Sequence, residues 1–245
     1  MPILIKPGSD EDRLRFLETA ELEDGHDTAL NNPRLSAATK ALMAARKAAF
    51  ASAFSGMAMR LGARVKEVTE AQRADSKLEV YVRDYIEVLK RRTYRLEHNI
   101  SVLTHHSLPQ DGSVPAINSR ADLVTVATNL ISGDGTAVGA GFPAMANPSA
   151  AEVNAKFGAA QTERSQVGPA DEALDQAQNI IAAQRAGIDE LIDDVIADIQ
   201  YKERKQDITS IRRILRRYGA KYEFTEGETP DPEPTPTPTP TPPPA

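Results

Sequence analysis

The chain has 245 residues, of which 40% are hydrophobic and 26% are charged, with no cysteine and no tryptophan. That apolar fraction can form a core and excludes wholesale disorder, while the absence of cysteine excludes disulfide bonds, thiolate catalysis and cysteine-ligated metals. The net charge of −6 argues against a general nucleic-acid binder, and no apolar run approaches the ~18–20 residues that cross a bilayer. We therefore expect neither nucleic-acid binding nor membrane insertion.

The first half of the sequence is typical of long helices. Ser9 and the acidic residues after it predict the start of a short helix that ends near Gly25. Residues 35–73 contain no proline and carry an apolar stripe with helical spacing. The second part of this stripe consists of Phe50, Phe54, Met57, Leu61, Val65 and Val68.

A second long helix is expected over residues 76–105. The polar residues at 73–76 favour a tight turn, which would make the two helices an antiparallel hairpin. The alternative is a single helix of ~70 residues with no turn between its halves.

Residues 107–148 predict a long connection that is rich in proline and glycine, and such connections usually carry function or an interaction surface. A short helix is expected inside it over residues 119–131, capped by Ser119 and stopped by Gly133. Ser149 with Glu152 forms a capping box that marks another helix start. Gly168-Pro169 then predicts a break or a restart.

From residue 170 to about residue 199 the apolar spacing predicts a third long helix. The acidic side chains near its end are expected to form a solvated face; they are Asp189, Glu190, Asp193, Asp194 and Asp198. Asp207 is expected to cap a last short helix closed by Gly219, and Tyr222 and Phe224 alternate with charges as in a short strand or extended arm. Nine of the residues at 229–245 are proline, mostly in a Thr-Pro repeat that predicts polyproline II.

These elements predict an all-α fold, an elongated up-and-down bundle of three to four long helices plus short accessory helices, with extended termini. We expect an arm with a short helix at residues 1–34, the bundle at 35–222, and an extended acidic, proline- and threonine-rich tail at 223–245. Residues 35–106 carry 13 basic and 7 acidic side chains, a net charge of +6, whereas residues 107–200 carry 4 basic and 13 acidic ones, a net charge of −9. The two blocks either pack on each other, which is the simpler interpretation, or recognise neighbouring copies.

The residues with chemical potential do not form a recognisable site. Glu23 and His26 give the single Glu-x-x-His spacing, where a di-iron bundle needs two, and the glycines at 133–141 match no phosphate loop. His105 and His106 are better explained as residues at the carboxyl end of a helix, and His98 lies seven residues before His105. We therefore expect no catalytic residue, no cofactor and no metal site, and so no enzyme.

Two basic clusters are the candidate interaction residues. They are Lys90, Arg91, Arg92 and Arg95, and Arg212, Arg213, Arg216 and Arg217. Each could bind phosphate or nucleic acid, but the favoured interpretation is that they face the acidic third helix.

The sequence predicts a non-enzymatic structural protein, a self-associating building block of a filament, a sheath or a cell-surface assembly. Its expected partners are copies of itself, and another surface protein is also considered. The alternative function is a helical protein-binding module or adaptor with a tethering tail. Repeated Thr-Pro favours an extracellular or cell-surface location over the cytoplasm, although no export signal is visible.

Overall fold

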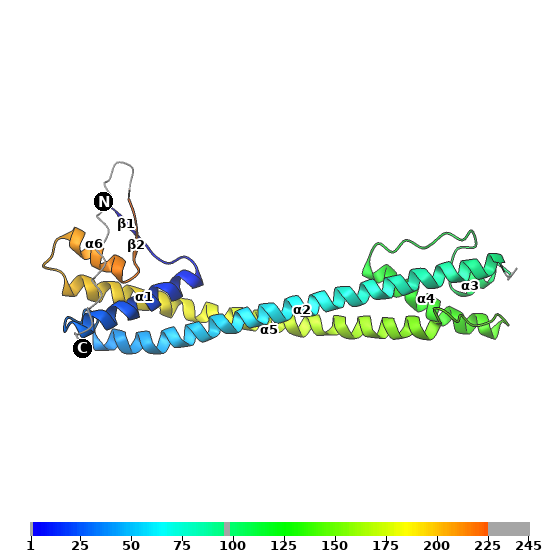
Figure 1. The fold of residues 1–245 in the computed structure, drawn as a ribbon, viewed down its shortest axis with the longest axis horizontal. Helices are drawn as coiled ribbons and strands as arrows, with labels where there is room; N and C mark the ends of the chain where they lie inside the picture. Colours follow the sequence, from blue (N-terminus) through cyan, green and yellow to red (C-terminus); the bar gives the residue numbers. More distant parts are fainter. Residues whose placement is uncertain (1, 96–98, 225–245) are drawn as a thin grey trace, which may run out of the picture. The chain divides into compact units, whose positions relative to one another are not determined.

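A computed structural model describes residues 2–95 and 99–224, and it confirms the all-α class, with 75% of these described residues in helices. The helices of this described part are α1 (Asp10–Ala29), α2 (Ala37–Arg95), α3 (Val102–His105), α4 (Arg120–Gly139), α5 (Ala150–Lys202) and α6 (Ile208–Arg217) (Figure 1). Two three-residue strands, β1 (Ile3–Ile5) and β2 (Lys221–Glu223), complete it. The predictions for His98 and for the tail at residues 229–245 lie outside the described residues.

The chain divides into two compact units, and the two long helices contribute to both. Unit 1 consists of Met1–Ala58 and Gln176–Ala245, and unit 2 consists of Met59–Asp175. In each unit α2 and α5 run antiparallel: Arg46 contacts Gly187 in unit 1, and Arg64 contacts Asp171 in unit 2.

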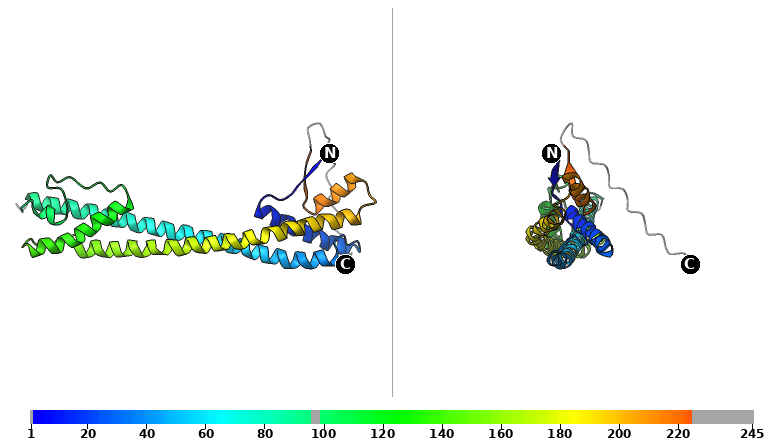
Figure 2. Two further views of the ribbon diagram at one scale, coloured as in Figure 1. Left: turned by 180° about the vertical axis from the view of Figure 1, so that it is seen from behind. Right: turned by 90° about the vertical axis from the view of Figure 1, so that its left-hand side faces the viewer.

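The core of unit 1 lies between α1, α6, the first part of α2 and the last part of α5 (Figure 2). Phe50 of α2, Leu191 of α5 and Leu215 of α6 are fully buried in it. Strands β1 and β2 pair antiparallel with Ile3 opposite Glu223, so the two ends of the described chain meet in this unit.

The core of unit 2 lies between the last part of α2, α3, α4 and the first part of α5. Val82, Leu103, Leu130 and Val153, one from each helix, are fully buried there. Gly133 of α4 allows α3 to approach closely, because a Cβ atom on it would lie 2.6 Å from the carbonyl oxygen of His105.

The four helix starts that were predicted from capping residues are confirmed. The side chains of Ser9, Ser119 and Asp207 each accept a hydrogen bond from a backbone N–H in the first turn of α1, α4 and α6. Ser149 and Glu152 form the expected capping box before α5, with a 3.2 Å bond from the Glu152 N–H to the Ser149 hydroxyl. Each cap satisfies donors that the first helical turn leaves without an intrahelical partner.

The predicted hairpin at residues 73–76 is wrong, because α2 continues through it as a single helix of 59 residues. Ala71 and Leu78, seven residues apart, are both buried, so the apolar stripe passes straight through the polar segment. Asp75 lies on the same face of the helix, is partly buried, and pairs with Arg120 of α4 at 3.3 Å. Arg73 and Ser76 are exposed, so these two polar residues mark an outer face of a continuous helix.

Three further predicted stops are also wrong: α1 passes Gly25, α4 passes Gly133, and α5 passes Pro169. A glycine inside a helix costs only about 1 kcal/mol, which side-chain packing readily offsets. Pro169 removes one backbone hydrogen bond, but Ala160 and Leu174 are buried on either side of it, and this packing holds α5 in one piece.

The acidic stretch of α5 is more than a solvated face, as it holds the amino-terminal segment of unit 1. Asp189 accepts a 2.8 Å hydrogen bond from Arg13, and Asp193 accepts one of the same length from Lys6. Asp198 accepts the backbone N–H of Ser36 at 2.8 Å. These contacts tie the arm and α1 to α5.

Candidate functional site

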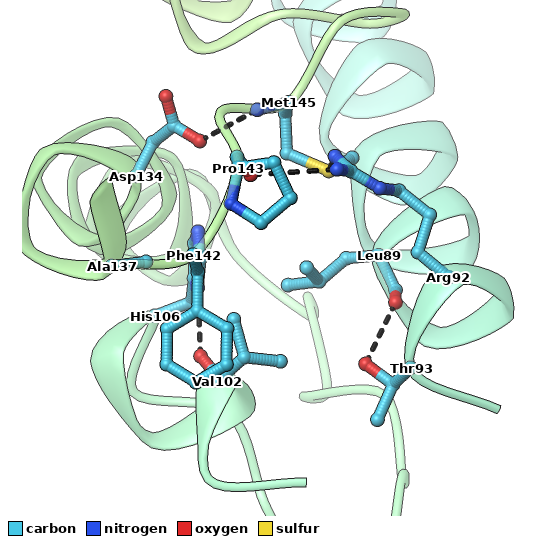
Figure 3. Close-up of a pocket in the computed structure, with 10 residues that line it drawn as sticks. All are labelled: Leu89, Arg92, Thr93, Val102, His106, Asp134, Ala137, Phe142, Pro143 and Met145. Carbon is cyan, nitrogen blue, oxygen red and sulfur yellow. Dashed lines mark hydrogen bonds between the residues drawn. The ribbon is translucent and has the colours of Figure 1, made fainter. Parts of the chain in front are cut away.

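A buried polar network in unit 2 joins α2, α3 and α4. His106 follows the last residue of α3 and is almost completely buried. Its Nδ1–H donates to the carbonyl oxygen of Val102 at 3.0 Å, as Figure 3 shows, so the ring caps α3. The sequence placed His106 at the end of a helix over residues 76–105, but α2 ends at Arg95, and the helix that His106 caps is the separate four-residue α3.

Sequence reasoning missed the partners of His106. The hydroxyl of Tyr85 lies 3.1 Å from Nε2 of His106 and 3.1 Å from Oδ1 of Asp134, and Asp134 also accepts the backbone N–H of Met145 at 3.0 Å. Tyr85 comes from α2 and Asp134 from α4, 49 residues apart. Tyr85 appears in the sequence as one more apolar stripe residue, so only its hydroxyl gives a signal for this network.

The protonation of the network follows from its burial. Burial lowers the pKa of His106, which favours the neutral ring with its proton on Nδ1. Burial raises the pKa of Tyr85, and the charge of Asp134 raises it further, so this hydroxyl keeps its proton. One hydroxyl proton then serves two acceptors, Nε2 of His106 and Oδ1 of Asp134. The network therefore holds three helices together through shared hydrogen bonds.

A small cavity of about 10 Å³ lies beside this network and has room for one water molecule (Figure 3). Arg92 closes one side, donating to the carbonyl oxygen of Ala144 at 3.1 Å and lying 3.1 Å from Sδ of Met145. The cavity is too small for a substrate, and Arg92, a predicted interaction residue, here fixes the segment that precedes α5.

The other basic residues predicted near the end of α2 also belong to unit 2. Lys90 pairs with Glu87 of its own helix at 3.6 Å, while Arg91 and Arg95 are exposed. The cluster therefore divides into two residues with contacts inside the unit and two that face solvent.

The second predicted basic cluster lies on α6 in unit 1. The sequence favoured contacts with the acidic third helix, whereas Arg217 of this cluster forms its ion pairs with α1. Arg217 pairs with Glu23 and, at 3.8 Å, with Asp27, both from α1. Arg216 lies over the ring of Phe224 at 5.8 Å, and Arg212 donates to Thr209 at 3.4 Å.

A buried ionic cluster in unit 1, at the ends of α1, α5 and α6, was also missed. Arg34 pairs with Asp27, and its Nε donates to Glu203 at 2.6 Å. The hydroxyl of Tyr218, the residue that follows α6, donates to Asp27 at 2.6 Å. Burial opposes the charge of Arg34, but its hydrogen bonds with the two carboxylates outweigh that effect and raise its pKa. The cluster joins α1, α6 and the end of α5.

Within the described residues, one group of three carboxylates has oxygens within 4.8 Å of one another: Glu67 and Glu70 of α2 and Glu163 of α5. Lys66 lies 3.4 Å from Glu67 and 3.2 Å from Glu70, so a cation from the chain itself already faces the group. Sequence reasoning missed this group because Glu163 lies 93 residues after Glu70 along the chain.

Part of the predicted apolar stripe of α2 is not buried. Leu61 is 47% exposed and Val65 is 54% exposed, both within unit 2, where the sequence predicted core positions. Gly62 and Ala63 beside them are exposed as well, and a Cβ atom on Gly62 would meet nothing within 4 Å. We refer to Leu61, Gly62 and Val65 as the exposed α2 stripe.

No protein-family model, curated protein or solved structure matches this chain. None of the described helices combines the length and apolar content needed to span a membrane.

Proposed function

We propose that the protein is a non-enzymatic structural protein that associates with copies of itself to build a filament, a sheath or a cell-surface assembly. The exposed α2 stripe carries this proposal. Leucine and valine at helical spacing, with a glycine between them, form the kind of surface that a second helix packs against closely. Exposed side chains of this type beside one another mark interaction surfaces more often than isolated ones do.

The distribution of charge supports a second copy as the occupant of this stripe. The residues at 35–106, which include the stripe, have a net charge of +6, and those at 107–200 have a net charge of −9. Arg60 and Lys66 flank the stripe in the sequence and are exposed. A neighbouring copy offers the complementary acidic block, which steers and orients such a contact.

The test is a pair of full-length variants with matched changes on α2. The double substitution Leu61→Glu with Val65→Glu places two charges on the stripe, and Met59→Glu places one on another side of the same turn. Met59 is 69% exposed, Leu61 47% and Val65 54%, so both variants should keep the helical circular dichroism of the wild type. We expect the wild type and Met59→Glu to assemble in electron microscopy and sedimentation across a concentration series, and the double variant to remain a monomer.

The result that contradicts the proposal is a wild-type chain that stays monomeric at the highest concentration. If that monomer captures another protein and the double variant does not, the stripe serves the alternative function, a helical binding module. Equal assembly of the wild type and the double variant would place self-association elsewhere on the molecule.

A further inference from the structure

The described chain ends beside the basic face of α6. Arg217 is held by α1, whereas Arg213 forms no ion pair with any residue in the described ranges. The guanidinium of Arg216 lies over the ring of Phe224, the last described residue, at 5.8 Å. The last described residue therefore lies next to an arginine of α6.

A groove of about 170 Å³ runs beside the same helix in unit 1. Its lining is mainly apolar and comes from the amino-terminal segment, α5, α6 and β2. The residues are Pro2, Leu4, Gln200, Ile208, Ile211, Arg212, Leu215 and Tyr222. Ile208 is 53% exposed at its edge. The groove thus combines an aromatic ring and aliphatic side chains with a guanidinium, a combination that accepts extended segments containing proline.

The segment after Phe224 has the complementary chemistry. Residues 225–234 contain four carboxylates, Glu226, Glu228, Asp231 and Glu233, and three prolines, whereas residues 235–245 contain no charged residue. All acidic residues that follow Phe224 therefore lie within nine positions of it.

We propose that the basic face and the groove of α6 bind the acidic, proline-containing segment at residues 226–233 of the same chain. Carboxylate–guanidinium hydrogen bonds with Arg213 and Arg216 supply the charge contacts, and the groove accepts the prolines. The first carboxylate is two residues from Phe224, so the tether gives the segment a high effective concentration at this surface. Binding in this way leaves the uncharged Thr-Pro repeat to extend from a fixed point. This inference does not depend on self-association.

The chain has no cysteine, so a single fluorophore can be attached to Thr229→Cys in the full-length protein. We expect high fluorescence anisotropy in low salt, and a fall with Arg213→Glu and Arg216→Glu to the value of a freely rotating label. The matched control is Arg91→Glu with Arg95→Glu, which makes the same change of charge in unit 2 and should leave the anisotropy unchanged. The signal should not depend on protein concentration, because the contact lies within one chain.

A second measurement uses a labelled synthetic peptide with the sequence of residues 225–234. It should bind at least tenfold more tightly to a full-length variant in which the four tail carboxylates are replaced by their amides than to the wild type. In the wild type, the chain's own segment already occupies the surface. Equal binding to both chains, or no binding to either, overturns the proposal. An anisotropy that rises only with concentration overturns it as well, by showing that the segment binds a second copy. A peptide with alanine in place of its prolines should bind at least fivefold more weakly, and equal binding would refute the role of the groove.

Discussion

Replacing Arg34 by alanine should destabilise the protein by about 3 kcal/mol. Arg34 is the cation between Asp27 and Glu203, whose side chains are only 3% and 9% exposed. Breaking a buried ion pair costs about 3–5 kcal/mol because the remaining charge is left in a low dielectric. Arg217, 3.8 Å from Asp27, still compensates part of that charge, so we expect the lower end of this range.

Urea unfolding at pH 7, followed by far-ultraviolet circular dichroism, measures this loss. With a dependence on urea of about 2–3 kcal/mol per molar, the midpoint should fall by about 1 M or slightly more. Arg64→Ala is the control, because the Arg64–Asp171 pair is nearly half exposed on both sides, and its loss should leave the midpoint nearly unchanged.

A second substitution tests the physical reason. Adding Glu203→Gln to Arg34→Ala removes one of the stranded charges and should restore part of the midpoint. If Arg34→Ala shifts the midpoint no more than Arg64→Ala does, or if Glu203→Gln lowers it further, the cluster is not held together by charge compensation.

Other residues give predictions of the same kind. Gly133→Ala should destabilise the protein by about 1–3 kcal/mol, because the added Cβ would meet the backbone of His105. Gly135→Ala in the same helix adds a Cβ that meets nothing, so it should stabilise the protein by up to about 1 kcal/mol. Thermal melts of the two variants check this difference in sign. Phe50→Ala should cost about 3–5 kcal/mol, since its ring is fully buried in unit 1, and a loss below about 1 kcal/mol in urea unfolding would contradict the packing described. Burial lowers the pKa of His106, so as the pH falls below about 6.5 the unfolded chain takes up its proton before the folded chain, and stability is lost. The unfolding free energy of the wild type should therefore fall more between pH 7.5 and pH 5.5 than that of His106→Gln, and parallel curves would show that His106 does not titrate in this way.

The starts of the capped helices could be predicted from the sequence because capping is local. Ser119 and Asp122 lie three residues apart, and the hydrogen bonds between them need no other part of the molecule. The helix ends could not be predicted in the same way. Whether Pro169 breaks α5 depends on the packing of Ala160 and Leu174, and these contacts come from segments far away in the chain.

The candidate sites show the same division. The basic residues of α6 are visible in the sequence, but their partners on α1 are not, because Glu23 and Arg217 are brought together only by the fold. The Tyr85–His106–Asp134 network was missed for the same reason. Periodicity assigns Tyr85 to the apolar face of α2 and gives no information on what its hydroxyl meets there.

The pairing of β1 with β2 determines how the protein responds to mechanical load. Both ends of the described chain leave this two-stranded β-ribbon at the same side, at the Ile3–Glu223 pair. A force that pulls these two ends apart therefore separates the strands one pair at a time, starting there, and does not shear all three pairs together. A ribbon of three pairs has little stability of its own, so it should open at low force and release slack before the load reaches the buried helices of unit 1.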